Sequence, residues 1–337
     1  MMPTGDSPTD PPTDGTATMA IGDKSGLSPG GATRDAFGKA LETLGERFPE
    51  VVVVDGDVGN STRTEAFAKA FPDRAFNVGI AEANMVSVAG GLASCGKTPV
   101  VASFAAFLLC NAYDQIRMSV TFPAQNVKLV GSHSGISIGE DGPSQMGIED
   151  VALACSLPGM TVIVPCDEIS TSKATEEMLQ REGPVYLRLG RPAVPRIYED
   201  DSEFVIGRAN QLRDGDDLTI IANGLMVAVA LDAAAELSDQ GISARVLDMH
   251  TVKPIDEPAV AAAARETQAI VVAEEHSANG GLGSAVAIAV SRTTPVPIAY
   301  VNTGDCYAES GDPDGLLEKY GLTSGRIVEA ARSVKAN

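Results

Sequence analysis

The segment "VVVVDGD", residues 51–57, is a run of four Val that ends in an acidic, Gly-containing loop. A short apolar run bounded by turn residues is typical of a buried β-strand. Similar strand-like runs follow at 75–80, 98–104, 126–132, 160–166 and 184–190. Stretches with the apolar spacing of a helix lie at 34–48, 82–93 and 167–182. Strands that are apolar throughout and joined by helices favour a parallel sheet covered on both faces, so the sequence predicts a doubly wound α/β domain.

A second series of the same kind follows a Pro- and charge-rich stretch at 190–204. Its strand-like runs are 217–223, 244–250, 269–275 and 296–302. Residues 1–30 are rich in Pro, Gly, Thr and Asp and hold few large apolar side chains, which is typical of disorder. The sequence therefore predicts a disordered acidic tail (1–30) and two α/β domains with mainly parallel sheets (31–199 and 200–337).

The composition narrows the class of partner. Asp and Glu number 45 against 25 Lys and Arg, a net charge of −20, which disfavours nucleic acid and anionic membranes as partners. No apolar run approaches the length of a membrane span, and no leader-like segment is evident, so a cytoplasmic protein is expected. The five Cys show no metal-ligand spacing, and no metal site is expected on this chain. An anionic substrate would need a local cluster of cationic side chains.

Polar loops follow the predicted strands, where ligands bind in open parallel sheets. The most unusual is "HSGISIGEDGPSQMGIED" (133–150), a Gly-rich acidic loop with one of only three His. Glu82 opens a helix directly after a strand: the carboxylate either complements the helix N-terminus or serves proton transfer. Phe104 and Phe107 have helical spacing, which fits core packing or a ligand platform. The Gly-rich stretch 280–286 is weak evidence for a dinucleotide site.

An ordered set of motifs removes much of this ambiguity. From residue 32 onward the chain contains "DGDVGNST", "GIAEANM", "SFAAF", "AYDQIRM", "GSHSGISIGEDGPSQM", "LRLGRP", "LDMHTVKPID", "EEHSANGGLG" and "DCYAESG" in this order. The set resembles the pyrimidine-binding and C-terminal domains of transketolases. The resemblance implies a thiamine diphosphate-dependent transferase that moves a two-carbon ketol unit from a ketose phosphate to an aldose.

The resemblance assigns five residues to the cofactor. Glu82 matches the catalytic Glu that hydrogen-bonds N1′ of the aminopyrimidine. Phe104 and Phe107 match the aromatic residues that hold the pyrimidine ring. Asp57 matches an Asp near the cofactor and the site entrance, and Gln145 matches a position that is His in many microbial members and Gln in animal-type ones.

Five further residues are assigned to the substrate by the same resemblance. Arg34, Ser61, His133 and Arg191 match the ligands of the substrate's phosphate end, and Asp141 matches the residue that hydrogen-bonds a sugar hydroxyl. Arg, His and Ser are suitable donors for an oxyanion. A phosphate and a sulfonate both fit such a site, so the donor and acceptor sugars stay open.

One expected part of the family pattern is missing. Full transketolases begin with a diphosphate-binding domain that carries a "GDG…N" magnesium motif, and this sequence has none before residue 32. The chain therefore resembles the C-terminal section of a split transketolase. The partners expected are an N-terminal subunit that binds Mg²⁺ (or Ca²⁺) with the cofactor diphosphate and a second copy of this chain, giving an α2β2 complex.

Two alternatives remain open. The chain could be the β subunit of another thiamine-dependent enzyme, such as a 2-oxoacid dehydrogenase or a deoxyxylulose-phosphate-synthase-like protein, or a catalytically silent regulatory subunit. Cys110 and Asn111 depart from the family pattern and affect the pocket wall, which leaves the acceptor undetermined.

Overall fold

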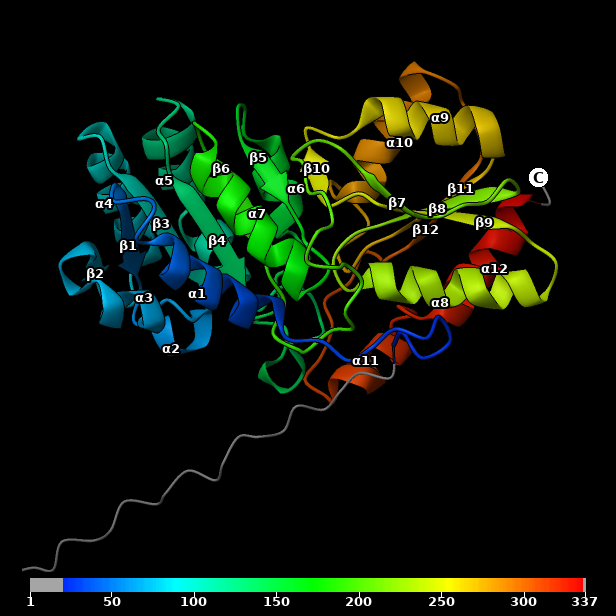
Figure 1. The fold of residues 1–337 in the computed structure, drawn as a ribbon, viewed down its shortest axis with the longest axis horizontal. Helices are drawn as coiled ribbons and strands as arrows, with labels where there is room; N and C mark the ends of the chain where they lie inside the picture. Colours follow the sequence, from blue (N-terminus) through cyan, green and yellow to red (C-terminus); the bar gives the residue numbers. More distant parts are fainter. Residues whose placement is uncertain (1–20, 336–337) are drawn as a thin grey trace, which may run out of the picture.

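Two β-sheets, each covered by helices on both faces, make up the computed structural model, which describes residues 21–335 (Figure 1). The first sheet is formed by seven strands in the order β10-β5-β6-β4-β3-β1-β2. Their bounds are β1 Val51–Asp55, β2 Ala75–Asn77, β3 Thr98–Phe104, β4 Lys128–Ser132, β5 Thr161–Ile163, β6 Val185–Arg188 and β10 Thr251–Lys253. All neighbouring strands pair in parallel except β10, which is antiparallel to β5.

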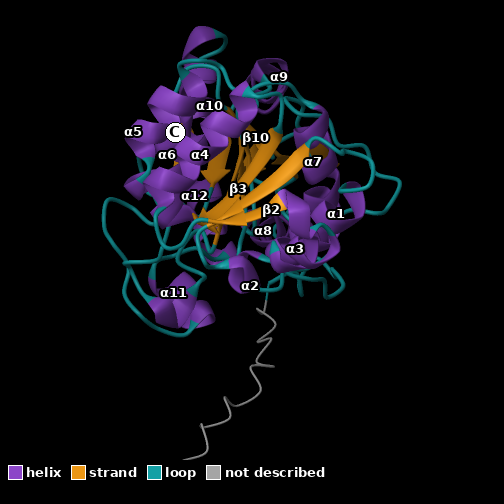
Figure 2. Ribbon diagram, turned by 90° about the vertical axis from the view of Figure 1, so that its left-hand side faces the viewer, coloured by secondary structure: helices purple, strands orange, loops and turns teal. Residues whose placement is uncertain are grey.

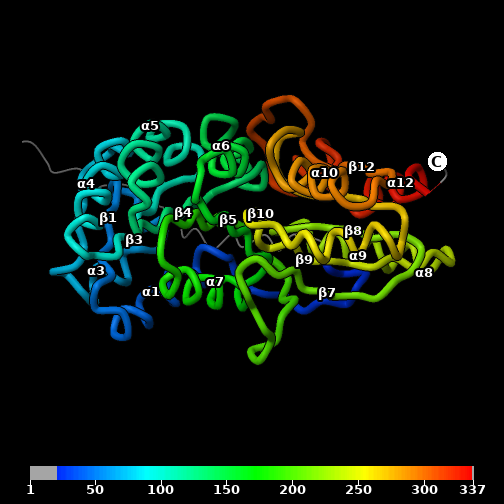
Figure 3. Tube along the Cα trace, turned by 90° about the horizontal axis from the view of Figure 1, so that it is seen from above, coloured from blue at the N-terminus to red at the C-terminus, as the bar shows by residue number. Residues whose placement is uncertain are grey.

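Two groups of helices cover this sheet, and both are visible from above in Figure 3. One face carries α1 Thr33–Leu44, α3 Glu65–Ala70 and α7 Glu168–Gln180. The other carries α4 Glu82–Ser94, α5 Tyr113–Gln115 and α6 Asp150–Ser156. The short helix α2 Gly59–Thr62 follows β1, and π-helical segments at Phe107–Asn111 and Ile116–Thr121 flank α5. This arrangement leaves the carboxyl ends of β1, β3 and β4 on one edge.

The second sheet has five strands in the order β12-β11-β8-β9-β7. Their bounds are β7 Asn210–Arg213, β8 Leu218–Ala222, β9 Ala244–Asp248, β11 Ile270–Ala273 and β12 Ile298–Val301. Helices α8 Met226–Asp239 and α12 Ser324–Lys335 pack on one face, and α9 Glu257–Thr267 and α10 Leu282–Arg292 on the other. Helix α11 Pro313–Lys319 lies beside the loop after β4. Figure 2 shows the sheet layer enclosed by helices.

The predicted α/β class with mainly parallel sheets is confirmed. Two strands escaped the sequence analysis, β7 and β10, and both are short edge strands that pair antiparallel. Their sequences, "NQLR" and "TVK", lack the apolar run by which a buried strand is recognised. The predicted strand at 75–80 ends at Asn77, where the backbone turns toward Gly79, whose φ is +76°.

The two halves of the chain share a core. Val162 and Val164, in and after β5, belong to the same buried cluster as Ile221 and Leu247 of the second sheet. Strand β10 comes from the second half of the sequence but extends the first sheet. The division at residue 199 therefore stays a prediction.

The predicted disordered tail is too long at its C-terminal end. Residues 1–20 lie outside the described part, but residues 21–30 pack against helix α8 and the segment around Arg196. The Asp232 carboxylate accepts hydrogen bonds from the main-chain N of Gly22 (2.7 Å) and of Ser25 (2.8 Å), and Ser28 forms a β-bridge with Arg196. A composition-based prediction could not detect these bonds, because their acceptor lies about two hundred residues away in the sequence.

Candidate active site

The carboxyl ends of β1, β3 and β4 bring together side chains that are far apart in the sequence. Phe104, the last residue of β3, lies opposite Ser132, the last residue of β4. His133 follows directly with φ +56°, a left-handed conformation that is uncommon outside glycine. This turn of the chain directs the imidazole back toward Phe104.

Three rings form a continuous stack. His133 lies over Phe104 with centroids 3.8 Å apart and planes 11° apart. Phe107 is parallel to Phe104 within 4°, at 5.3 Å. Because His133 covers one face of Phe104 directly, Phe107 must occupy the opposite face. Phe104 is thus enclosed between two rings. Phe107, which is half-buried, is the outer ring of the stack, and one of its faces points away from Phe104.

Arg34 and His133 are hydrogen-bonded partners. The Arg34 Nη1 lies 2.9 Å from His133 Nε2, and the Ser132 hydroxyl lies 2.8 Å from His133 Nδ1. Since a guanidinium can only donate, Nε2 accepts and the ring proton resides on Nδ1, which donates to Ser132. Arg34 Nη1 also donates to the main-chain carbonyl of Ser61 at 3.3 Å, so Ser61 contacts Arg34 through its backbone.

The electrostatics of this cluster favour an anion. Burial, together with the positive charges of Arg34, Arg191 and Arg63, lowers the pKa of His133 to about 3. Burial followed by the Arg63 charge lowers the pKa of Arg34 to about 10. Its Nε is buried and has no hydrogen-bond partner among the described residues, although Asp35 lies 3.9 Å away. A buried cationic donor without a partner is costly, and an oxyanion would relieve it.

Arg191 enters the cluster from the segment after β6. Its Nη1 donates to the carbonyl of Ile138 at 2.9 Å and lies 3.5 Å from Asp141 Oδ2 and 3.7 Å from Glu140 Oε2. The Arg191 side chain is 39% exposed, against 16% for Arg34. Asp141, the predicted sugar-binding residue, is therefore paired with the predicted phosphate ligand Arg191.

Glu82 is the first residue of α4 and is buried. Its Oε1 accepts one long hydrogen bond, 3.4 Å, from the hydroxyl of Ser103. Ser103 directly precedes Phe104, so the carboxylate lies near the end of β3 that carries the ring stack. Its remaining acceptor capacity is available to a ligand.

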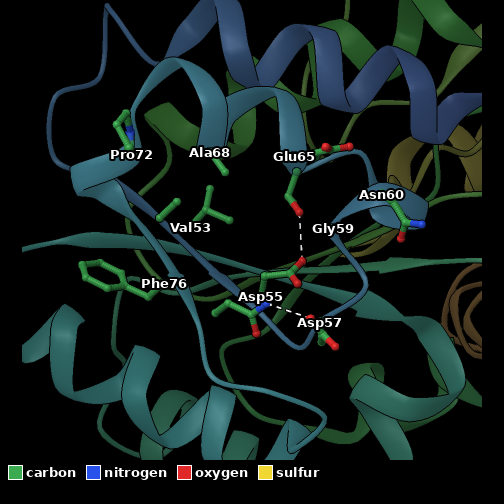
Figure 4. A pocket seen from close by; sticks show the side chains of 12 residues that line it. Val53, Asp55, Asp57, Gly59, Asn60, Glu65, Ala68, Pro72 and Phe76 are labelled. Carbon is green, nitrogen blue, oxygen red and sulfur yellow. Dashed lines mark hydrogen bonds between the residues drawn. The ribbon is translucent and has the colours of Figure 1, made fainter. Parts of the chain in front are cut away.

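Two predicted residues lie apart from this group. Asp57 is exposed, has φ +69° and accepts a hydrogen bond from Asn77 Nδ2 at 3.0 Å. Figure 4 shows it with Asp55 in a cavity of about 510 Å³ between β1, β2 and helix α3. Gln145 is half-buried and accepts a hydrogen bond from Ser144. Within residues 21–335, neither side chain bonds to the ring stack or to Arg34.

Arg63 is a member of the cluster that the sequence analysis missed. It lies at the left-handed C-terminus of α2 with φ +67°, donates to Asp35, and acts electrostatically on Arg34 and His133. Its position two residues after Ser61 was the available signal. Within the described residues, no group of three or more His, Cys, Asp and Glu side chains is arranged to hold a metal ion. Among residues 21–335, no helix combines the length and apolar character needed to cross a bilayer.

Comparison with known proteins identifies the family. Residues 30–196 match the family profile "Transketolase, pyrimidine binding domain", and residues 207–327 match "Transketolase, C-terminal domain". The chain belongs to the transketolase family. The family is thiamine diphosphate-dependent, and the two sheets of this chain match the fold expected from the resemblance.

Its relatives include subunits of divided transketolases. The chain is 44% identical to the 6-deoxy-6-sulfo-D-fructose transketolase subunit SqwH of Clostridium sp. (strain MSTE9), over 89% of this chain and 94% of the relative. It is 41% identical to a putative transketolase C-terminal section of Methanocaldococcus jannaschii, over 88% and 94%. A solved structure described as a split gene transketolase, inactive beta4 tetramer, superposes with a TM-score of 0.84 at 46% identity, covering 91% of this chain and 99% of that one. This chain is thus a transketolase-type subunit.

Proposed function

We propose that this chain is the C-terminal subunit of a two-subunit transketolase, which transfers a two-carbon ketol unit from a ketose with an anionic end to an aldose. The observation that carries the proposal is the Arg34–His133 pair against the Phe104–Phe107 stack, where the buried Arg34 Nε has no hydrogen-bond partner within residues 21–335. This arrangement brings a candidate anion site and an aromatic surface together at one edge of the first sheet.

The residues present fit the pyrimidine end of thiamine diphosphate. When bound, the cofactor supplies a carbanion equivalent and an electron sink. Phe107 offers the free ring face against which an aminopyrimidine packs. The buried Glu82 carboxylate has free acceptor capacity and would hold the proton at N1′ of that ring.

The cationic cluster accounts for the substrate's anionic end. Arg34 would supply the donors, Arg191 would add a second guanidinium at the exposed side, and Asp141, beside Arg191, would accept from a sugar hydroxyl. His133 sets the position of Arg34 by accepting its hydrogen bond. Phosphate and sulfonate both fit this chemistry, and the relative from Clostridium is described as acting on a sulfonated sugar.

The partner proposed is an N-terminal transketolase subunit that supplies the diphosphate-binding domain and its Mg²⁺ or Ca²⁺. Two copies of each chain would form an α2β2 complex. The support comes from relatives described as a subunit and as a C-terminal section, and from the solved relative described as an inactive β4 tetramer.

The test is reconstitution. The chain is purified alone and with an N-terminal transketolase subunit, thiamine diphosphate and Mg²⁺, and ketol transfer is measured with phosphorylated and sulfonated ketoses. We expect no turnover by the chain alone and turnover by the pair. Acyl transfer to a lipoyl acceptor would identify a 2-oxoacid dehydrogenase subunit, and a stable but inactive pair with every donor would refute the proposal.

A further inference from the structure

The loop that carries His133 rests on the second half of the chain. Ile136 and Ile138 are fully buried in the same apolar cluster as Leu218 of β8 and Val271 of β11. Farther along the loop, a Cβ on Gly139 would lie 2.8 Å from Pro313. Although the loop follows β4 of the first sheet, its apolar side is part of the core of the second.

A carboxylate from the second half of the chain contacts the main chain of this loop. Glu275, two residues after β11, is buried, and its Oε1 accepts a hydrogen bond from the main-chain N of Ser137 at 2.6 Å. The carboxylate lies so close to Gly135, whose φ is +76°, that a Cβ there would stand 2.0 Å from Glu275 Cδ. The contact therefore begins two residues after His133.

Glu275 is itself held in place from the first sheet. Arg188 Nη2 donates to the Glu275 carbonyl at 3.0 Å and to the Gly147 carbonyl at 2.9 Å, and Arg188 Nε donates to Asp150 at 2.8 Å. Gly147 in turn accepts from the main-chain N of Gly135 at 2.7 Å. The loop is thus fixed between Gly147 on one side and the Glu275 carboxylate on the other.

We propose that Glu275 is a positioning residue: from the second half of the chain it holds residues 135–137 so that His133 keeps its left-handed backbone and meets Arg34 and Phe104. In this proposal Glu275 touches neither substrate nor cofactor. Any effect of Glu275 on catalysis rests on the proposed function. Without the carboxylate, a buried main-chain N–H would lose its acceptor, and the loop would gain alternative conformations. Burial raises the pKa of Glu275 to about 7, and a protonated carboxyl still accepts from Ser137.

The chain provides a matched control next to Glu275. Glu274 is equally buried, but its two carboxylate oxygens accept from the main-chain N of Leu282 and of Gly283, both at 2.7 Å, at the start of α10. Glu274→Ala therefore removes a buried carboxylate from the second half without touching the loop. Glu275→Gln is the conservative variant, because its side-chain oxygen can still accept from Ser137.

The first readout is the titration of His133 in the full-length chain, followed by NMR with labelled histidine. In the wild type, burial and the Arg34 charge keep His133 neutral across pH 5–8. In Glu275→Ala we expect a His133 that titrates within this range, and in Glu274→Ala and Glu275→Gln one that does not. If His133 titrated in Glu275→Ala as it does in the wild type, the proposal would be overturned. It would also be overturned if Glu274→Ala changed the titration of His133 as much as Glu275→Ala does.

The second readout is affinity for inorganic phosphate, measured by calorimetry on the same chains. We expect a loss of about tenfold or more for Glu275→Ala, the effect of a charged hydrogen bond, and less than about twofold for Glu274→Ala. Gly135→Ala approaches the contact from the other side and should give a similar loss. Its effect should be smaller when combined with Glu275→Ala, because the shorter side chain removes the clash; additive losses would count against the contact.

Reconstitution with the N-terminal subunit separates this inference from the proposed function. We expect Glu275→Ala to raise KM for an anionic donor and to leave kcat with a short uncharged ketol donor unchanged. A wild-type pair that is inactive, with His133 still responding to Glu275→Ala, would refute the function and leave the positioning role. An active wild-type pair whose KM and His133 titration ignore Glu275→Ala would refute the positioning role alone.

Discussion

Replacing Arg34 by Met should impair anionic substrates far more than the same change at Arg191. Met keeps most of the length of the side chain and removes the charge. The Arg34 side chain is 16% exposed, its Nε has no hydrogen-bond partner among residues 21–335, and the nearest carboxylate oxygen in that range lies 3.9 Å from Nε. An anion at Arg34 therefore gains a hydrogen bond from Nε without displacing a carboxylate, although it competes with His133 for Nη1. Arg191 is 39% exposed and already lies 3.5 Å from Asp141, so an anion must compete with that carboxylate.

The magnitudes follow from these environments. A charged hydrogen bond in a buried site contributes about 1.5–3 kcal/mol, which corresponds to a loss of roughly 10- to 150-fold in kcat/KM for Arg34→Met. An exposed, already paired charge contributes about 0.2–1 kcal/mol, or a loss of at most about fivefold for Arg191→Met. The pKa of His133 should rise in Arg34→Met, because Arg34 lowers it more than any other charge does.

The assay is kcat/KM in the reconstituted complex, with a phosphorylated donor and a short uncharged ketol donor. Arg47→Met serves as the control, because Arg47 is exposed and pairs with Glu176 away from the site. Circular dichroism melting of each variant checks the fold. Equal losses on both donors, or a larger loss at Arg191 than at Arg34, would show that the cluster does not bind the anion in the way described.

Three further predictions concern the ring stack, the buried carboxylate at α4 and a second buried acid. Glu82→Gln should leave the melting temperature nearly unchanged, since a helix N-terminal charge contributes at most about 1 kcal/mol, and should lower ketol transfer by orders of magnitude; near-normal turnover would reject its role. Phe107→Leu should weaken cofactor binding in the complex, and Phe104→Leu should weaken both cofactor and phosphate binding, because it also removes the ring that His133 packs on. Calorimetry with each ligand would distinguish the two variants. Burial raises the pKa of Asp248 to about 7, so the folded chain binds an extra proton and this contribution to stability falls as pH rises from about 4 to 7. The free-energy difference between wild type and Asp248→Asn should shift by up to about 4 kcal/mol across that range in denaturant titrations; a pH-independent difference would contradict this.

The alternating strands and helices were predictable because they depend on local pattern. Runs such as Val51–Asp55 and Thr98–Phe104 are apolar and bounded by polar loops, and the structure places strands there. Strand β10 was not predictable, since its three residues carry no run and its partner β5 lies in the other half of the sequence. The order of residues 21–30 likewise depends on Asp232, which no local pattern connects to them.

Some features of the candidate site were likewise predictable from the sequence, and others were not. The motifs predicted Arg34, His133 and Phe104, and the structure brings these three together. Neither the enclosure of Phe104 between two rings nor the contact of Glu275 with Ser137 was predictable, because both depend on backbone conformation and on distant parts of the chain. The enclosure of Phe104 depends on the left-handed φ of His133. The contact between Glu275 and Ser137 joins residues that are 138 positions apart in the sequence.

The protonation of His133 connects the charge of the substrate to the chemistry of the site. With its proton on Nδ1, His133 cannot donate from Nε2, and it accepts from Arg34 instead. An anion that engages Arg34 competes for this donor and at the same time offsets the positive charges that, in addition to burial, lower the pKa of His133 to about 3. Both changes favour a proton on Nε2, which would give the anion a further donor. A phosphate dianion offsets more charge than a sulfonate monoanion, so proton uptake on binding should be larger for a phosphorylated ketose than for a sulfonated one.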